Sequence, residues 1–147
     1  MHLQLVIDRS IMQLAWTDSR ESMQLLAEID RLCHNVVVTD GINRRYLKDY
    51  DALRKRYPQG ASLLNTGKLY LLWKETGKVD DRRRSSELPP VKGESAIKDE
   101  DREFVRLAKL IDAPLVANDG PLIDQGLKLG FRAMNVSQAL KMFFKTQ

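Results

Sequence analysis

The sequence predicts an α/β fold, a single parallel-sheet α/β/α sandwich. Short apolar runs typical of buried strands alternate with longer segments whose apolar residues recur at helical spacing. Two of these runs, residues 3–7 and 114–117, lead into the aspartates Asp8 and Asp119. A chain of 147 residues is long enough to bury a core of its own, so we expect one domain over 1–147.

The N-terminal part of the chain predicts two strands separated by helix. Residues 3–7 are short and apolar, as in a buried strand, and residues 11–15 have a helical pattern. A second helix is expected to begin at Asp18, where Glu21 three residues later completes a capping box. Three consecutive β-branched residues at 36–38 predict the next strand.

The middle of the chain predicts two helices followed by a long irregular segment. Asp40 can cap the first of these helices, and Pro58 and Gly60 would end it. Apolar residues favour a second helix over 61–75. Residues 77–98 show poor periodicity and contain paired prolines and several serines, so we expect an irregular insertion or loop there.

The C-terminal third returns to alternating helices and strands. A helix over 99–111 has one apolar face and leads into the second of the two runs described above. Pro121 suits the first turn of the next helix, and Gly130 suits its end. A last strand is expected over 131–136, followed by a helix that Ser137 caps.

The composition is that of an ordinary globular protein, with 43% hydrophobic and 30% charged residues. No apolar stretch approaches the roughly 18 residues of a membrane span, and the N-terminus lacks the features of a signal peptide. The lone Cys33 excludes an internal disulfide. We therefore expect a cytoplasmic protein with no membrane partner.

The basic charge favours a polyanionic partner. The net charge is +4 and the isoelectric point is about 9.3, and cationic side chains bind nucleic acid by displacing counterions from phosphates. Solubility alone also explains a charge of this size, so both interpretations stay open. The residues assigned to nucleic-acid binding come from two of the basic clusters: Arg45, Arg82, Arg83 and Arg84.

Three aspartates are expected to meet at one edge of the sheet. Asp8 and Asp119 follow strands, and Asp101 opens the helix that leads into the second strand. Ligands of parallel sheets bind at the carboxyl ends of the strands. Each acid alone could be a cap or a turn residue, but several gathered carboxylates repel one another unless a cation neutralises them. The pattern therefore predicts a site for a hard divalent cation.

Three stretches of the chain resemble the PIN-domain family of nucleases. Residues 6–10, Val-Ile-Asp-Arg-Ser, resemble its opening strand, in which Asp is followed two residues later by Ser, Thr or Asn. Residues 98–108 resemble its central helix, and residues 113–122 resemble its apolar strand followed by Asp. The resemblance spans essentially the whole chain, and its most specific part is 99–122.

The resemblance implies a PIN-like fold and an endoribonuclease that depends on Mg²⁺ or Mn²⁺. Asp8, Asp101 and Asp119 match three of the four catalytic, metal-binding acids of the family. Ser10 would orient a ligand carboxylate or a water. The implied partner is RNA. Since the fold also serves toxin–antitoxin pairs, a cognate inhibitor protein is open by analogy, as is a homodimer.

One acid of the family pattern is missing. Arg45 occupies the position of the second acid, a glutamate, and Asp49 or Asp40 could take its place. The arginine could instead replace the metal as a permanent counter-charge. Two functions therefore stay open: a metal-dependent ribonuclease, and a catalytically degenerate PIN-like module that binds RNA or a protein partner. A phosphotransfer receiver domain is disfavoured because Asp8 lacks a paired acid nearby in the sequence.

Overall fold

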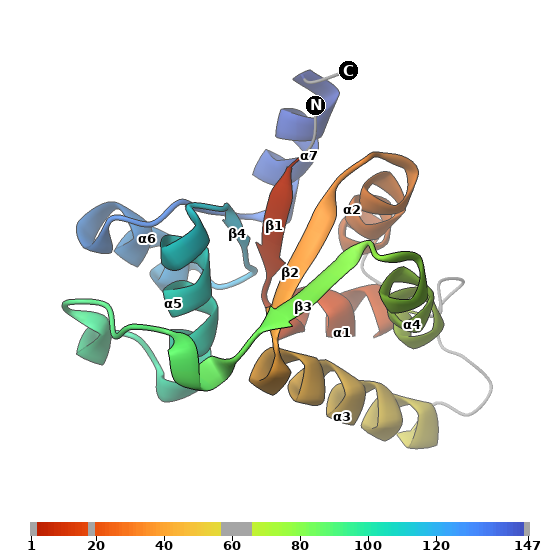
Figure 1. The fold of residues 1–147 in the computed structure, drawn as a ribbon. Coiled ribbons are helices and arrows are strands. Elements are labelled where there is room, and N and C mark those ends of the chain that lie inside the picture. Colours follow the sequence, from red (N-terminus) through yellow and green to blue (C-terminus); the bar gives the residue numbers. More distant parts are fainter. Residues whose placement is uncertain (1–2, 18–19, 57–65, 146–147) are drawn as a thin grey trace.

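The computed structural model describes residues 3–17, 20–56 and 66–145. Its strands form one parallel sheet with the order β3-β2-β1-β4-β5, so that β1 lies at the centre (Figure 1). The strands are β1 (Gln4–Ile7), β2 (Asn35–Thr39), β3 (Val79–Arg83), β4 (Leu115–Val116) and β5 (Ala133–Met134).

Helices cover both faces of the sheet. α2 packs against α1 and α7, whereas α5 packs directly on β1. The chain steps from β1 towards β3 and later from β4 towards β5 in the opposite direction, and right-handed crossovers then place their helices on opposite faces. The predicted α/β/α sandwich is confirmed. The helices are α1 (Arg9–Thr17), α2 (Arg20–Arg31), α3 (Asp40–Arg56), α4 (Thr66–Thr76), α5 (Arg102–Ile111), α6 (Gly120–Leu129) and α7 (Val136–Lys145).

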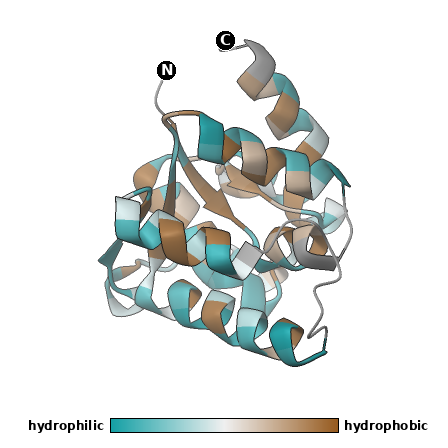
Figure 2. Cartoon of the chain, turned by 90° about the vertical axis from the view of Figure 1, so that its right-hand side faces the viewer, coloured by the Kyte–Doolittle hydropathy of each residue, from teal (hydrophilic) through white to brown (hydrophobic). Residues whose placement is uncertain are grey.

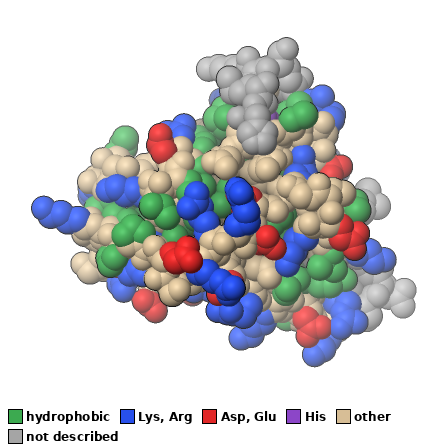
Figure 3. Space-filling view, viewed as in Figure 1, with side chains coloured by type: hydrophobic (Ala, Val, Ile, Leu, Met, Phe, Trp, Pro, Cys, Tyr) green, Lys and Arg blue, Asp and Glu red, His purple; other side chains and the backbone are tan. Residues whose placement is uncertain are grey.

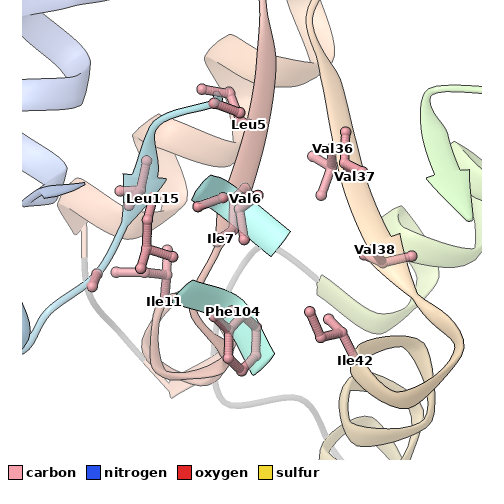
Figure 4. Close-up of a cluster of buried hydrophobic side chains, with 14 of the residues drawn as sticks. Leu5, Val6, Ile7, Ile11, Val36, Val37, Val38, Ile42, Phe104 and Leu115 are labelled. Carbon is pink, nitrogen blue, oxygen red and sulfur yellow. The ribbon is translucent and has the colours of Figure 1, made fainter. Parts of the chain in front are cut away.

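The core is built around the two central strands. Leu5, Val6 and Ile7 of β1 are fully buried, as expected for a strand covered by helices on both sides. Phe104 of α5 and Ile42 of α3 are also fully buried, and they join the side chains of β1 and β2 in one cluster (Figure 4). A central strand is correspondingly brown in Figure 2, whereas the helices alternate brown and teal segments. Each such apolar side chain contributes about 1.5–3 kcal/mol by burial.

Residues 77–98 are less irregular than expected, because they begin with strand β3. This strand lies at the edge of the sheet and pairs with β2 through backbone contacts such as Val36 with Val79. Only Val79 of its five residues is buried. An edge strand with polar side chains shows no apolar alternation, so the hydropathy pattern could not reveal it. The rest of the segment contains two short 3₁₀ turns, at 85–87 and 94–96.

The start of α7 differs from the prediction, whereas the end of α6 agrees with it. α7 begins before Ser137, and Asn135 caps it: its Oδ1 accepts from the Gln138 amide at 2.8 Å, and its own amide donates to Gln138 Oε1 at 2.9 Å. α6 ends at Gly130 in the left-handed conformation, with φ of 78°, as expected. The cap expected at Asp18 and the stop expected at Pro58 and Gly60 lie outside the described residues.

The helix expected over 99–111 begins as a 3₁₀ turn at 99–101, and α5 proper starts at Arg102. Asp101 therefore lies at the junction of the turn and the helix. In the described part of the chain, no helix is both long and apolar enough to cross a membrane.

Candidate active site

The order of the strands reverses at β1, which pairs with β2 on one side and β4 on the other. Ligands of open parallel sheets bind in the crevice at such a reversal, beyond the carboxyl ends of the strands. Asp8 directly follows β1, and its amide donates to the Val116 carbonyl at the end of β4, at 2.9 Å. Asp119 follows three residues after Val116. The topology thus places the first and the last candidate acids at this crevice.

A cavity of about 330 Å³ opens at this crevice. The candidate acids Asp8, Asp101 and Asp119 all contribute to its wall, so the structure brings these three together. Its lining also includes Ser10, which was predicted, and four residues that were not: Arg9, Gln13, Glu100 and Asn118.

Asp8 is the most deeply buried of the acids, with 5% of its surface exposed. The Ser10 hydroxyl donates to its Oδ2 at 2.6 Å, whereas its Oδ1 is buried and accepts no hydrogen bond from the described residues. Burial raises the pKa of Asp8, and the Asp119 carboxylate adds to this, against the opposing effects of Ser10 and Arg9. A buried carboxylate oxygen without a partner is costly, and a bound cation would remove that cost.

The charged form of Asp101 is disfavoured by partial burial and by neighbouring carboxylates. Burial raises its pKa to about 6, with further contributions from the carboxylates of Asp8, Glu100 and Asp119. The Lys98 ammonium acts in the opposite direction. The carboxylates at the sheet edge therefore repel one another, and this repulsion favours the binding of a divalent cation.

Asp119 has a structural role as well as its place in the cavity. It is the N-cap of α6, and its Oδ1 accepts from the Leu122 amide at 3.5 Å. Its backbone is extended there, as is usual at an N-cap. The carboxylate consequently lies at the positive end of the α6 dipole, which stabilises its negative charge.

The carboxylates share one cavity but are not drawn into a closed ligand shell. Among residues 3–17, 20–56 and 66–145, no three acidic, histidine or cysteine side chains stand close enough to ligate one ion together. Mutual repulsion is a sufficient reason for this spacing, because the acids raise one another's pKa. Oxygen ligands on a strand end, a 3₁₀ turn and a helix cap suit Mg²⁺ or Mn²⁺, which also keep several waters.

Arg9 is the residue that sequence reasoning missed. It follows Asp8 as the first residue of α1, and it brings a cation to the wall of the acidic cavity. Its guanidinium is held by a two-point ion pair with Asp49, Nε to Oδ2 at 3.0 Å and Nη2 to Oδ1 at 2.6 Å. Its position next to the leading aspartate was the available signal.

Neither acid considered as a replacement for the missing glutamate lines the acidic cavity. Asp49 uses both oxygens to hold Arg9, and it lines a separate, mostly apolar cavity with Met12 and Tyr46. Asp40 accepts from the Ser85 amide at 2.7 Å and from the Gly41 amide at 3.0 Å. These bonds tie the loop after β3 to the start of α3.

Arg45 is likewise absent from the wall of the acidic cavity. Its Nη1 donates to the Glu100 carbonyl at 2.8 Å, and its Nη2 lies 3.6 Å from Glu103 Oε1. Its guanidinium carbon lies 5.9 Å from the centre of the Phe104 ring. Arg45 thus binds the start of α5, and the cation that faces the acids is Arg9 instead.

The three consecutive arginines at the end of β3 differ in their surroundings. Arg82 pairs with Asp80 through Nε at 2.9 Å and Nη2 at 2.8 Å, and Arg84 lies 3.9 Å from Asp40 Oδ2. Figure 3 shows Lys and Arg side chains spread over one face of the molecule, many of them beside Asp or Glu. Ion pairs of this kind reduce the charge that the basic residues can offer to a polyanion.

The arrangement of the elements matches that of a known protein. The structure is similar to a solved PilT N-terminus (PIN) domain protein from the hyperthermophilic archaeon Sulfolobus solfataricus P2. The fold is PIN-like. The likeness covers 96% of this chain and 93% of that chain, with a TM-score of 0.52 and 17% sequence identity, so it establishes the fold alone. No protein-family profile matches the sequence, and no curated protein matches it.

Proposed function

We propose that this protein is an endoribonuclease that depends on Mg²⁺ or Mn²⁺, with Asp8, Asp101 and Asp119 as its metal-binding residues. The observation that carries the proposal is that Asp8, whose buried Oδ1 lacks a hydrogen-bond partner among the described residues, lines one cavity together with two further carboxyl groups. A PIN-like fold, which is associated with nucleases, agrees with this chemistry.

The residues around the cavity have different roles in this proposal. A bound Mg²⁺ or Mn²⁺ would activate water and neutralise the charge that develops on the scissile phosphate. Ser10 holds one oxygen of Asp8, and the other, which has no partner among the described residues, could ligate the cation. Asp119 is fixed by the first turn of α6, and Asp101 by the start of α5, so these ligands come from rigid elements.

Arg9 supplies the positive charge that a phosphate needs at this acidic site. A guanidinium can bind two phosphate oxygens at once, and the Asp49 pair keeps its orientation fixed before substrate arrives. About a third of the Arg9 side chain, 36%, is exposed, which leaves donors for a substrate. Arg9 is therefore assigned to substrate phosphate and Asp49 to positioning Arg9.

The alternative function is a catalytically degenerate module that binds RNA or a protein partner, such as a cognate inhibitor. Two observations favour it: Arg9 brings a cation into the acidic cavity, and Asp49, one of the two replacement acids, is fully occupied by that cation. In this alternative Arg9 neutralises the carboxylates itself, and no divalent ion is needed.

The test is cleavage of fluorescently labelled single-stranded RNA by purified protein with Mg²⁺, with Mn²⁺ and with chelator. The proposal expects metal-dependent cleavage that Asp8→Asn abolishes and that the control Asp124→Asn, away from the acidic cavity, retains. If the unmodified protein and Asp124→Asn both bind RNA but cleave it with neither Mg²⁺ nor Mn²⁺, the binding module is supported and the nuclease proposal is overturned.

A further inference from the structure

A second cavity, of about 110 Å³, adjoins the acidic one. The two share Asp101 and Asp119 as a common wall. The other lining residues of the second cavity come from the 3₁₀ turn at 94–96, the residues after it and the first turns of α6; they are Ala96, Ile97, Lys98, Pro121, Leu122 and Gln125.

The chemistry of this second cavity differs from that of the acidic one. Ile97 and Leu122 are buried and offer apolar contact area, and Pro121 adds a compact apolar ring. Gln125 carries an amide that both donates and accepts hydrogen bonds. Away from the shared acids, the cavity therefore combines apolar surfaces with one amide and the Lys98 ammonium, a composition that suits a small, flat, polar-edged ring.

We propose that this cavity binds the base of the nucleotide next to the scissile phosphate. The inference rests on the proposed nuclease function and assigns its substrate a second point of contact. With a phosphate at the acidic cavity, the neighbouring base must lie within one nucleotide of it, and the shared wall of Asp101 and Asp119 puts the second cavity at that place.

Charge favours a neutral base over a phosphate in this cavity, because its two carboxylates outnumber its one ammonium, that of Lys98. Two of its lining residues are carboxylates, which repel an anion, whereas a base is neutral. Unstacked bases of single-stranded RNA are commonly held between flat or apolar side chains and read along their edges. Ile97 and Leu122 would contact the faces of the ring, and Gln125 would pair with its edge.

Lys98 complements this arrangement. It is exposed, and it lines the second cavity but not the acidic one, so it marks the side of the shared wall that faces the second cavity. An ammonium there can contact the next phosphate along the strand. The strand would then run from the acidic cavity, past its base in the second cavity, to Lys98.

The test uses neutral ribonucleosides, because they probe the base without involving phosphate or metal. Adenosine, guanosine, cytidine and uridine are titrated separately into ¹⁵N-labelled protein in chelator. At least one is expected to shift the amides of Ile97, Leu122 and Gln125 in a saturable way. Gln125→Ala should weaken that binding about fivefold or more, since a good bidentate hydrogen-bond pair with a base edge contributes about 1–3 kcal/mol. Gln24→Ala, on the exposed side of α2, should not.

A filling variant gives an independent readout. Ala96 is exposed and lines the cavity, so Ala96→Trp should occlude it without disturbing the core, and Ala27→Trp on α2 is the matched control. Ala96→Trp should abolish the shifts and change which RNA positions are cut. Shifts confined to other residues, or a cleavage pattern identical in Ala96→Trp and Ala27→Trp, would overturn the base site.

The two proposals can fail separately. Saturable shifts at the cavity in a protein that never cleaves RNA would leave the base site standing and remove the nuclease. Metal-dependent cleavage without any nucleoside-induced shift at the second cavity would support the nuclease and remove the base site.

Discussion

Asp101 shows how a single residue can report on the charge of the acidic cavity. Its folded pKa of about 6 lies above the ordinary value of 3.8, so between about pH 4 and pH 6 the folded state holds a proton that the unfolded state has lost. Stability is therefore lost as the pH rises through this window. At pH 7 without metal, Asp101→Asn should raise the free energy of unfolding by on the order of 1 kcal/mol, after allowance for solvent screening.

Denaturant unfolding in chelator at pH 4 and pH 7 measures this effect. The gain should be present at pH 7 and small at pH 4, and the control Asp124→Asn, outside the acidic cavity, should show neither. Excess Mg²⁺ should reverse the order at pH 7, because the unmodified protein gains a ligand that Asp101→Asn lacks. An equal effect of Asp101→Asn at both pH values would show that folding does not raise the pKa of Asp101.

The Arg9–Asp49 pair can be tested by a double-mutant cycle. Arg9→Gln, Asp49→Asn and the double variant should give a coupling energy of about 1 kcal/mol in denaturant unfolding, since the pair is bidentate and Asp49 is buried. The exposed pair Arg54–Asp51, at 2.8 Å, is the matched control and should give a clearly smaller coupling energy, because water and salt screen it. Additive effects in both cycles would mean that Asp49 does not hold Arg9 in solution.

At the scale of elements, Asp119 combines a helix cap with a ligand position, and two substitutions separate these roles. Asn is as good an N-cap as Asp, so Asp119→Asn should change stability by only a few tenths of a kcal/mol, whereas Asp119→Ala should lose about 1 kcal/mol. Both should lose Mn²⁺ binding, measured by calorimetry. Retention of full Mn²⁺ affinity by Asp119→Asn would remove this residue from the metal site.

The elements that sequence patterns revealed are those whose burial is one-sided or complete. β1 and β2 are continuous apolar runs and α5 has a clear apolar stripe, so each was predictable. β3 was not, because its stability comes from backbone pairing with β2 while most of its side chains are polar and lie outside the core. The cap of α7 was placed at Ser137 because Ser is a common cap, but the reciprocal bonds of Asn135 and Gln138 decide it.

At the scale of the whole molecule, the sheet topology explains why three acids distant in sequence could be predicted to meet. Strand ends of a parallel sheet share one edge, so Asp8 and Asp119 were placed by their strands alone. Side-chain pairing obeys no such rule. That Arg45 binds the start of α5, and that Arg9 rather than Arg45 faces the acids, depends on packing between elements that no local pattern encodes.

The basic surface gives a prediction for the whole molecule as well. Replacing Arg82, Arg83 and Arg84 together with Ala should flatten the log–log salt dependence of RNA binding by about 0.7 for each phosphate that these side chains neutralise. The change should be smaller than three phosphates would give, because Arg82 is already paired with Asp80.

A filter-binding titration measures this slope. A triple Ala variant of three exposed cations that lie apart in the sequence, Arg31, Arg132 and Lys141, serves as its control. Equal slopes for both variants would show that the arginine triplet makes no phosphate contacts of its own.

The central claim is that Asp8, Asp101 and Asp119 together hold a divalent cation. Anomalous diffraction from a crystal soaked in Mn²⁺ tests it most directly, because manganese is located without reference to any assumed function. The account predicts one strong anomalous peak between these three carboxyl groups, with Asp8 Oδ1 among its ligands and Arg9 still paired with Asp49. Contradiction would come from the Arg9 guanidinium lying between the carboxylates in place of the metal, with no anomalous peak at the cavity.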